Sequence, residues 1–334
     1  MRGLVIPQLT GPDAAVVGEV AEPTGAHPWA NGDRLLIDVE ATGISFPDLL
    51  QSRGQYQHAQ PPPYVTGGEV AGTVLEAPPL SRFARGDRVA SLTLWGGAAE
   101  RALGLPQYTI KLPPQMSWVD GAALQLNYAT AWFALYRVHV RPDETVLVHG
   151  AAGGVGTATI QVARALGATP IAVVSTDEKE RVAREAGAEL IVRPVDGWVA
   201  EVKSLTSGRG VNVVVDPVGG DRFTDSLRSL DLGGRLAVVG FAGGEIPHVK
   251  VNRLLLRDLS LVGVALAPYV ERHPHVAVEL TTALERLAVR GDLRPFVGHV
   301  LDLEDGAEAL RLLDRREALG KVVVRVKEAC TDLT

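Results

Sequence analysis

TVLVHGAAGGVGTATIQVARALGA, residues 145–168, runs from a β-branched stretch through a glycine-rich turn into a segment with helical apolar spacing. The turn places Gly150, Gly153 and Gly156 three residues apart. A Walker-type phosphate loop requires a lysine after its last glycine, and Thr157 stands there instead. The stretch therefore predicts a dinucleotide turn, in which the free N–H groups at the start of the helix face a pyrophosphate.

The pattern around this turn indicates the fold class. The spacing G-x-x-G-x-x-G departs from the usual G-x-G-x-x-G, so the interpretation depends on its context. Short β-branched runs alternate here with helix-length amphipathic segments, which predicts a doubly wound parallel sheet. The expected strands span 145–149, 170–174, 189–192, 211–215, 235–239 and 259–264, and the expected helices span 154–166, 178–186, 197–206 and 221–230.

The two ends of the chain have a different pattern. The first 120 residues contain many Gly and Pro breaks and short alternating runs, which indicates a mostly β domain. Ser117, followed by Asp120 three residues later, resembles a capping box before a helix expected at 118–137. After residue 270 the pattern predicts helices at 275–290 and 304–315, then a final strand, GKVVVRV.

Composition restricts the possible partners. The chain has 334 residues, 46% of them hydrophobic and 22% charged, enough for a large core in about two domains. The net charge of −6, without a basic stripe, argues against nucleic acid or an anionic membrane as the main partner. Its beginning lacks the apolar centre of a signal peptide, so a cytoplasmic location is expected. The single cysteine, Cys330, excludes an intrachain disulfide and a multi-cysteine metal site.

Seven segments in order resemble the zinc-independent quinone oxidoreductase branch, zeta-crystallin-like, of the medium-chain dehydrogenase/reductase superfamily. The resemblance covers nearly the whole chain. It implies an α/β protein in which a mostly β GroES-like catalytic domain, 1–122 and 266–334, is interrupted by a Rossmann NADPH-binding domain, 123–265. It also implies a homodimer or tetramer. The segments are GISFPDLLQSRGQY, GGEVAGTV, GDRVA, HGAAGGVGTATIQVARALGA, VVVDPVGG, GRLAVVG and GKVVV.

The resemblance also indicates chemistry without a metal. Zinc alcohol dehydrogenases of this superfamily hold their catalytic metal with a cysteine and with the histidine of a G-H-E motif. Ser45 and Gly68 occupy the matching positions, and only Glu69 is retained. One carboxylate and a neutral serine do not make a zinc site. This disfavours alcohol oxidation and favours hydride delivery to a conjugated acceptor, such as a quinone or an enone.

The tip of the second expected strand indicates the cofactor. NAD-specific domains place an acid there, whereas this chain has Ser175. Lys179 matches a lysine that similar family members direct toward the 2′-phosphate, and Arg193 is a second candidate cation; solvated surface positions are the alternative for both. We therefore expect NADPH. The resemblance implies further cofactor contacts at Thr130, Gly150, Gly153, Gly154, Val155, Gly156, Phe241, Ala242 and Lys321.

The candidate catalytic residues are Tyr56 and Ser45. Tyr56 is either a surface aromatic or a hydrogen-bond donor to a substrate oxygen; its phenol acts as donor because its ordinary pKa is near 10. Many relatives carry asparagine at the Ser45 position, which leaves the role of a serine there open. The neighbouring polar residues are interpreted structurally: Asp48 and Asp216 as helix caps, Gly68 as a close-approach glycine, Glu69 as the partner of a buried arginine, and His149 as a packed residue.

Three functions are compatible with these residues. The first is NADPH-dependent quinone reduction, and the second is reduction of α,β-unsaturated carbonyls or enoyl thioesters. The third is NADPH binding without significant turnover. A basic entrance for a phosphopantetheine arm would favour an enoyl thioester, and no clustered basic residues indicate one.

Overall fold

The computed structural model describes residues 1–327, which form two units. Unit 1 contains Met1–Leu126, Ala277–Val289 and the described chain from Pro295 onward; unit 2 contains Asn127–Val276 and Arg290–Arg294. The boundaries expected from the sequence, after residues 122 and 265, both lie earlier in the chain. Cys330 lies outside the described residues.

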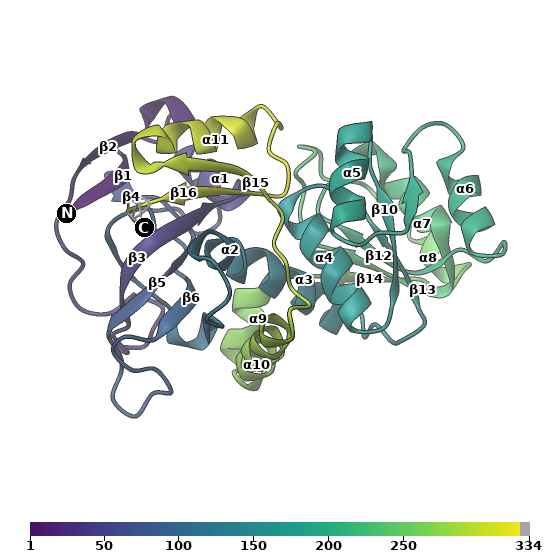
Figure 1. The fold of residues 1–334 in the computed structure, drawn as a ribbon. Helices are drawn as coiled ribbons and strands as arrows, with labels where there is room; N and C mark the ends of the chain where they lie inside the picture. Colours follow the sequence, from purple (N-terminus) through teal and green to yellow (C-terminus); the bar gives the residue numbers. More distant parts are fainter. Residues whose placement is uncertain (328–334) are drawn as a thin grey trace, which may run out of the picture. The chain divides into compact units, whose positions relative to one another are not determined.

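Unit 2 is built on the predicted doubly wound sheet. Its six strands are all parallel and follow the order β11-β10-β9-β12-β13-β14, so the order reverses between β9 and β12. Figure 1 shows these strands among the helices of the unit. The strands are β9 (Thr145–Val148), β10 (Thr169–Val173), β11 (Leu190–Val192), β12 (Val211–Asp216), β13 (Leu230–Val238) and β14 (Ser260–Gly263). In such sheets, ligands bind beyond the carboxyl ends of the strands at the reversal.

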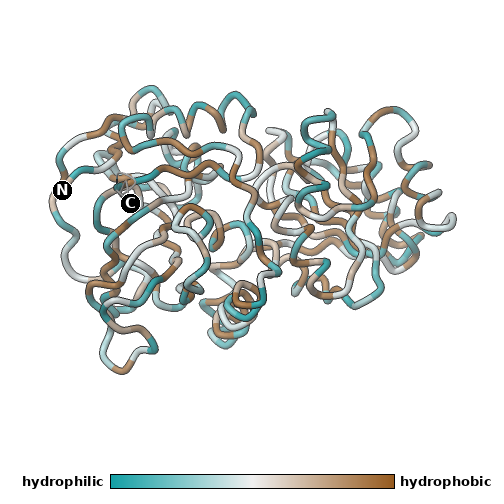
Figure 2. The backbone as a smooth tube through the Cα atoms, viewed as in Figure 1, coloured by the Kyte–Doolittle hydropathy of each residue, from teal (hydrophilic) through white to brown (hydrophobic). Residues whose placement is uncertain are grey.

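Burial on both faces explains why the β-branched runs of unit 2 become central strands. Val146, Leu147 and Val148 of β9 are fully buried, and each buried side chain of this size stabilises the fold by about 1.5–3 kcal/mol. Figure 2 shows hydrophobic residues gathered along the strands. The helices of unit 2 are α3 (Gln125–Arg137), which begins in unit 1, α4 (Gly154–Ala165), α5 (Asp177–Glu185), α6 (Trp198–Leu205), η3 (Gly220–Arg222), α7 (Phe223–Ser229), α8 (Asn252–Leu255) and α9 (Leu266–Arg272).

Unit 1 is mostly β, as expected. Its main sheet follows the order β15-β16-β3-β5-β6-β8, with β7 paired to β3, and a smaller sheet follows the order β2-β1-β4. The strands of the main sheet are β3 (Leu36–Ile44), β5 (Glu69–Glu76), β6 (Arg88–Leu92), β7 (Arg101–Leu103), β8 (Thr109–Lys111), β15 (Val297–Asp302) and β16 (Lys321–Arg325). Those of the smaller sheet are β1 (Arg2–Ile6), β2 (Val16–Glu19) and β4 (Tyr64–Val65).

Strand β16 comes from the far end of the chain and runs antiparallel beside β3, with Val322 opposite Ile44 (Figure 1). The helices of unit 1 are η1 (Pro12–Ala14), α1 (Phe46–Ser52), η2 (Pro106–Tyr108), α2 (Trp118–Ala122), α10 (His275–Arg290), η4 (Leu303–Asp305) and α11 (Gly306–Asp314). None of the helices in residues 1–327 is long and apolar enough to span a bilayer.

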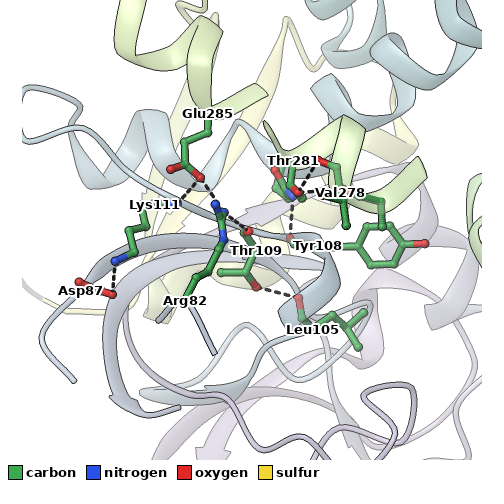
Figure 3. A network of polar contacts seen from close by, with 11 residues as sticks. Arg82, Asp87, Leu105, Tyr108, Thr109, Lys111, Val278, Thr281 and Glu285 are labelled. Atoms are coloured by element: carbon green, nitrogen blue, oxygen red, sulfur yellow. Dashed lines mark hydrogen bonds and ion pairs between the residues drawn. The ribbon is translucent and has the colours of Figure 1, made fainter. Parts of the chain in front are cut away.

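Charged contacts hold α10 in unit 1 (Figure 3). The guanidinium of Arg82 donates to Glu285 of α10 at 2.6 Å and to the carbonyl of Thr109 at 3.0 Å. On β8, which also contains Thr109, the amide of Lys111 donates to Glu285 at 3.4 Å, while the Lys111 ammonium pairs with Asp87 at 2.8 Å. These contacts give a physical reason why Ala277–Val289 belongs to unit 1.

The prediction of a single helix at 118–137 is wrong. The structure has two helices, α2 and α3, with a break at residues 123–124. Ser117 caps α2 as predicted, because its hydroxyl accepts from the amide of Asp120 at 3.0 Å. At the start of α3, the amide of Leu126 donates to the carboxylate of Glu69 at 2.9 Å. This contact with a distant residue is not visible in the local pattern.

Candidate cofactor and substrate sites

The glycine turn forms a cradle at the N-terminus of α4. Gly150 has φ +57°, which favours glycine, and a Cβ at Gly156 would overlap the carbonyl oxygen of Gly150. The first helical hydrogen bond joins the amide of Thr157 to the carbonyl of Gly153 at 2.9 Å. The preceding amides, of Gly154 to Gly156, therefore have no acceptor within the helix. This bare helix start suits a pyrophosphate, so the residues fit a dinucleotide.

The loop after β10 contains the predicted 2′-phosphate residues. Ser175 is exposed, and Lys179 lies half-buried in the first turn of α5, whose N-cap Thr176 accepts from the Lys179 amide at 3.2 Å. Arg193 donates to Asp177 at 2.7 Å and to Glu180 at 2.6 Å. These two ion pairs, which no local sequence pattern indicates, give Arg193 carboxylate partners within unit 2.

Two loops meet beyond the carboxyl ends of β12 and β13. Phe241 is 38% exposed and lies over Gly219, where a Cβ would come within 2.9 Å of its ring. The amide of Ala242 donates to the carbonyl of Pro217 at 3.1 Å. The helix-cap interpretation of Asp216 is wrong: its carboxylate accepts from the amides of Val218 and Gly219 and closes a turn, and Gly219 precedes η3.

Two other candidate residues of unit 2 lie on α3 and directly after β9. Thr130 lies half-buried on α3. His149, directly after β9, is buried as expected, and its Nε2 lies 2.8 Å from the hydroxyl of Ser226. Burial lowers the pKa of His149 and so favours the neutral ring.

Unit 1 contains a buried charge cluster, which we define as Ser45, Asp48, Glu69 and Lys321. Lys321 of β16 is 3% exposed and Glu69 of β5 is 0% exposed. The ammonium of Lys321 donates to Glu69 Oε1 and to Ser45 Oγ. The prediction that Glu69 pairs with a buried arginine is therefore wrong, because its partner is a lysine. A Cβ at Gly43 would lie 2.5 Å from the Lys321 side chain, so the glycine makes room for the lysine.

Asp48 joins the same cluster from α1. Its carboxylate accepts from the amides of Ser45 at 2.8 Å and Gly67 at 3.0 Å, and from the hydroxyl of Thr66 at 3.3 Å. It is part of a capping box with Ser45, so its predicted capping role is confirmed. Burial raises the pKa of Asp48 to about 6, although Lys321 and the backbone hydrogen bonds lower it.

Gly68 differs from its predicted role. A Cβ there would meet the Asp48 carboxylate at 3.6 Å, which is an ordinary van der Waals distance. The close-approach interpretation of Gly68 is therefore wrong, because the position has room for a side chain. In the part of the chain that the structure describes, no three His, Cys, Asp or Glu side chains gather as a metal site requires.

Tyr56 follows α1 in the same segment of unit 1. It is half-buried, and its ring lies edge-on to His58 with centroids 5.5 Å apart. Burial raises the pKa of the Tyr56 phenol, and the negative charge of Asp48 raises it further. The phenol therefore keeps its proton at neutral pH, which suits a hydrogen-bond donor rather than a base.

Comparison with known proteins identifies the family of the chain. The model of the alcohol dehydrogenase GroES-like domain matches residues 31–139, and that of the zinc-binding dehydrogenase matches residues 154–282. Quinone oxidoreductase-like protein 2 of Bos taurus is 39% identical over 296 residues, covering 87% of this chain and 84% of the relative. The chain belongs to the quinone oxidoreductase-like family of medium-chain dehydrogenases and reductases.

Solved structures agree with membership of the quinone oxidoreductase-like family. A probable oxidoreductase from Mycobacterium abscessus superposes with a TM-score of 0.87 at 38% identity, covering 97% of this chain and 98% of the other. The quinone oxidoreductase from Thermus thermophilus, solved also in complex with NADPH, gives a TM-score of 0.81 at 33% identity, covering 97% and 100%. The expected family and fold class are confirmed, and the chain is an oxidoreductase of the quinone oxidoreductase-like type.

Proposed function

We propose that this oxidoreductase uses NADPH to reduce a quinone to a hydroquinone. The reaction balances as quinone plus NADPH plus a proton, giving hydroquinone plus NADP⁺. Bound NADPH supplies the hydride, and the chain supplies binding, orientation and hydrogen bonds. Support comes from the glycine cradle of unit 2, from a relative named as quinone oxidoreductase-like, and from the quinone oxidoreductase of Thermus thermophilus, which was solved with NADPH.

The chain offers separate contacts for the two phosphate regions of the cofactor. The amides of Gly154, Val155 and Gly156 at the start of α4 suit the pyrophosphate. Lys179, in the first turn of α5, is the proposed contact of the 2′-phosphate, and Arg193 shares its charge with two carboxylates. The remaining proposed cofactor contacts are Thr130, Gly150, Gly153, Ser175, Phe241, Ala242 and Lys321.

The observation that carries the proposal is the hydrogen bond between Lys321 and Ser45. Because Ser45 Oγ accepts from a buried ammonium, its hydroxyl still has a proton to donate. The ammonium also favours negative charge near that oxygen. As hydride arrives, one oxygen of the acceptor gains negative charge, and Ser45 or Tyr56 donates a hydrogen bond to it. Solvent supplies the proton that completes the hydroquinone.

A steady-state assay at 340 nm tests this function. The purified protein is mixed with NADPH and a quinone, an enone or an enoyl thioester, and with NADP⁺ and a saturated alcohol. We expect quinone to give the highest kcat/KM. A higher kcat/KM with the enone or thioester would reassign the acceptor, binding without turnover would identify a non-catalytic protein, and rapid alcohol oxidation would overturn the metal-free chemistry.

Two substitutions identify the donor. General acid assistance contributes about 10² to 10⁴ in rate, so removing the donor by Tyr56→Phe or Ser45→Ala should lower kcat by at least about 100-fold at unchanged NADPH affinity. Ser45→Thr, which keeps the hydroxyl, should restore activity. Tyr108→Phe, a buried tyrosine of unit 1 in η2, is the matched control. If both kcat values stay within a few-fold of wild type, the donor is water or a backbone amide.

We further propose that the chain forms a homodimer through β14. This strand is the last in the sheet of unit 2, and edge strands carry unpaired backbone groups. Exposed apolar side chains lie close to it in sequence: Val251 is 75%, Leu255 83% and Leu256 75% exposed. A second copy would cover such a patch. Light scattering should give a dimer mass for wild type and a monomer mass for Leu255→Glu/Leu256→Glu; equal masses would reject this interface.

A further inference from the structure

Five aromatic rings of unit 1 form a group that we call the aromatic cluster: His27, Trp29, Tyr56, His58 and Trp95. The centroids of His27 and Trp95 lie 4.6 Å apart, and those of Trp29 and His58 lie 4.5 Å apart. Trp29 also stands edge-on to Trp95 at 6.1 Å, and Tyr56 to His58 at 5.5 Å. The rings come from three segments far apart in the sequence.

The aromatic cluster combines one buried ring with four partly accessible rings. His27 is buried, whereas the other four rings are half-buried. Burial lowers the pKa of His27 to about 4, so its ring is neutral at pH 7. Half-exposed indole and phenol rings retain apolar surface that a flat ligand can cover.

Helix α1 connects the aromatic cluster to the charge cluster. Gln51, near its end, donates from Nε2 to the carbonyls of Leu94 at 3.2 Å and His58 at 3.4 Å, and so holds both aromatic segments. The same helix begins directly after Ser45. Its seven residues span about 10 Å, so Ser45 lies directly before the start of a short helix that carries Gln51 near its end.

An unpaired polar atom lies beside the rings. Gln51 is 1% exposed, and its Oε1 is buried with no hydrogen-bond partner in the described chain. A buried acceptor without a donor costs about 1–3 kcal/mol. A hydroxyl on a ligand supplies such a donor, and a hydroquinone carries two hydroxyls.

We propose that the aromatic cluster stacks the ring of a planar acceptor, with Trp29 and Trp95 as specificity-determining residues for ring-containing quinones over ring-free enones. This inference rests on the proposed quinone reduction and names the substrate class of that site. Ring stacking on aromatic side chains contributes enough affinity for about a tenfold preference. Ring-free enones have no aromatic face to stack and therefore do not gain this affinity.

The kinetic test compares Trp95→Leu and Trp29→Leu with wild type on 1,4-naphthoquinone and on but-3-en-2-one. We expect KM for the naphthoquinone to rise about tenfold, while kcat, NADPH affinity and the kinetics with the enone stay within about twofold. Trp118→Leu is the matched control, because this tryptophan of unit 1 lies under the Arg88 guanidinium at 4.1 Å, outside the aromatic cluster. Equal losses on both acceptors, or no loss, would overturn the inference.

A binding measurement separates this inference from the proposed function. Without NADPH, 1,4-naphthoquinone should quench the tryptophan fluorescence saturably in wild type and in Trp118→Leu, and only linearly in Trp29→Leu/Trp95→Leu. If the protein does not turn over quinones but the quenching is saturable and depends on the aromatic cluster, quinone reduction is rejected and ring binding at the cluster is kept. If the protein does turn over quinones but the quenching is linear in wild type, ring binding at the aromatic cluster is rejected and quinone reduction is kept.

Discussion

Replacement of Lys321 by methionine should strongly destabilise unit 1. The substitution keeps an unbranched side chain but leaves Glu69 charged at 0% exposure with no ammonium beside it. Removing one partner of a buried ion pair costs about 3–5 kcal/mol. Counting the two lost charge-assisted hydrogen bonds, to Glu69 and Ser45, at about 1.5–3 kcal/mol each leads to a similar figure.

Hydrogen exchange read by mass spectrometry measures this loss, because it resolves the strands of unit 1 from those of unit 2. Amides of β5 and β16 should lose about 3–5 kcal/mol of protection in Lys321→Met, while those of β9 stay unchanged. The double variant Lys321→Met/Glu69→Leu should recover part of the loss, because it removes the unpaired charge of Glu69, whereas Asp48 stays buried.

Lys327→Met provides the matched control. Lys327 also contacts two carboxylates, Asp38 and Glu40, each at 2.8 Å, but it is 37% exposed. Its loss should therefore cost about 1 kcal/mol or less. If Lys321→Met and Lys327→Met lost the same protection, the charge cluster would be solvated, and the argument from burial would fail.

Three further predictions follow from the sites. Elemental analysis should find no stoichiometric zinc, because Ser45 and Gly68 replace the metal ligands; one zinc per chain, lost on chelation together with activity, would contradict this. Lys179→Ala should weaken NADPH binding about 10- to 100-fold in calorimetry while NADH binding barely changes, and equal losses would assign Lys179 to the fold. Burial raises the pKa of Asp48 from 3.8 to about 6, so the folded state binds this proton more tightly than the unfolded state and its ionisation lowers stability as pH rises through this range. Between about pH 4 and pH 6, the free energy of unfolding measured in urea should therefore fall by about 2 kcal/mol more in wild type than in Asp48→Asn. Parallel curves of this free energy against pH would reject the assignment.

The elements of unit 2 could be predicted because their signals are local. A buried parallel strand, a glycine turn and an amphipathic helix each leave a pattern within a few residues, as in β9, the turn at Gly150 and α4. The capping role of Asp48 was equally readable, because its partner Ser45 lies three residues away.

Features that depend on distant residues could not be predicted. Glu69 and Lys321 are 252 residues apart, and no spacing rule relates a glutamate at the start of one strand to a lysine at the start of another. The break between α2 and α3 lies in a continuous apolar pattern without proline, next to the amide that Glu69 accepts from. Arg193 looked available for a phosphate because its partner Glu180 lies on another element, thirteen residues away.

The position of β16 beside β3 has a consequence for synthesis of the chain. Ribosomes add about 5–20 residues per second, so the 252 residues between Glu69 and Lys321 take about 13–50 s to make. During that interval the continuous segment Asn127–Val276 of unit 2 leaves the ribosome with all its sheet strands. We expect unit 2 to fold first, which protease resistance of stalled nascent chains would show. The carboxylate of Glu69 then stays in water until its counter-charge is translated, so the unit that starts first is finished last.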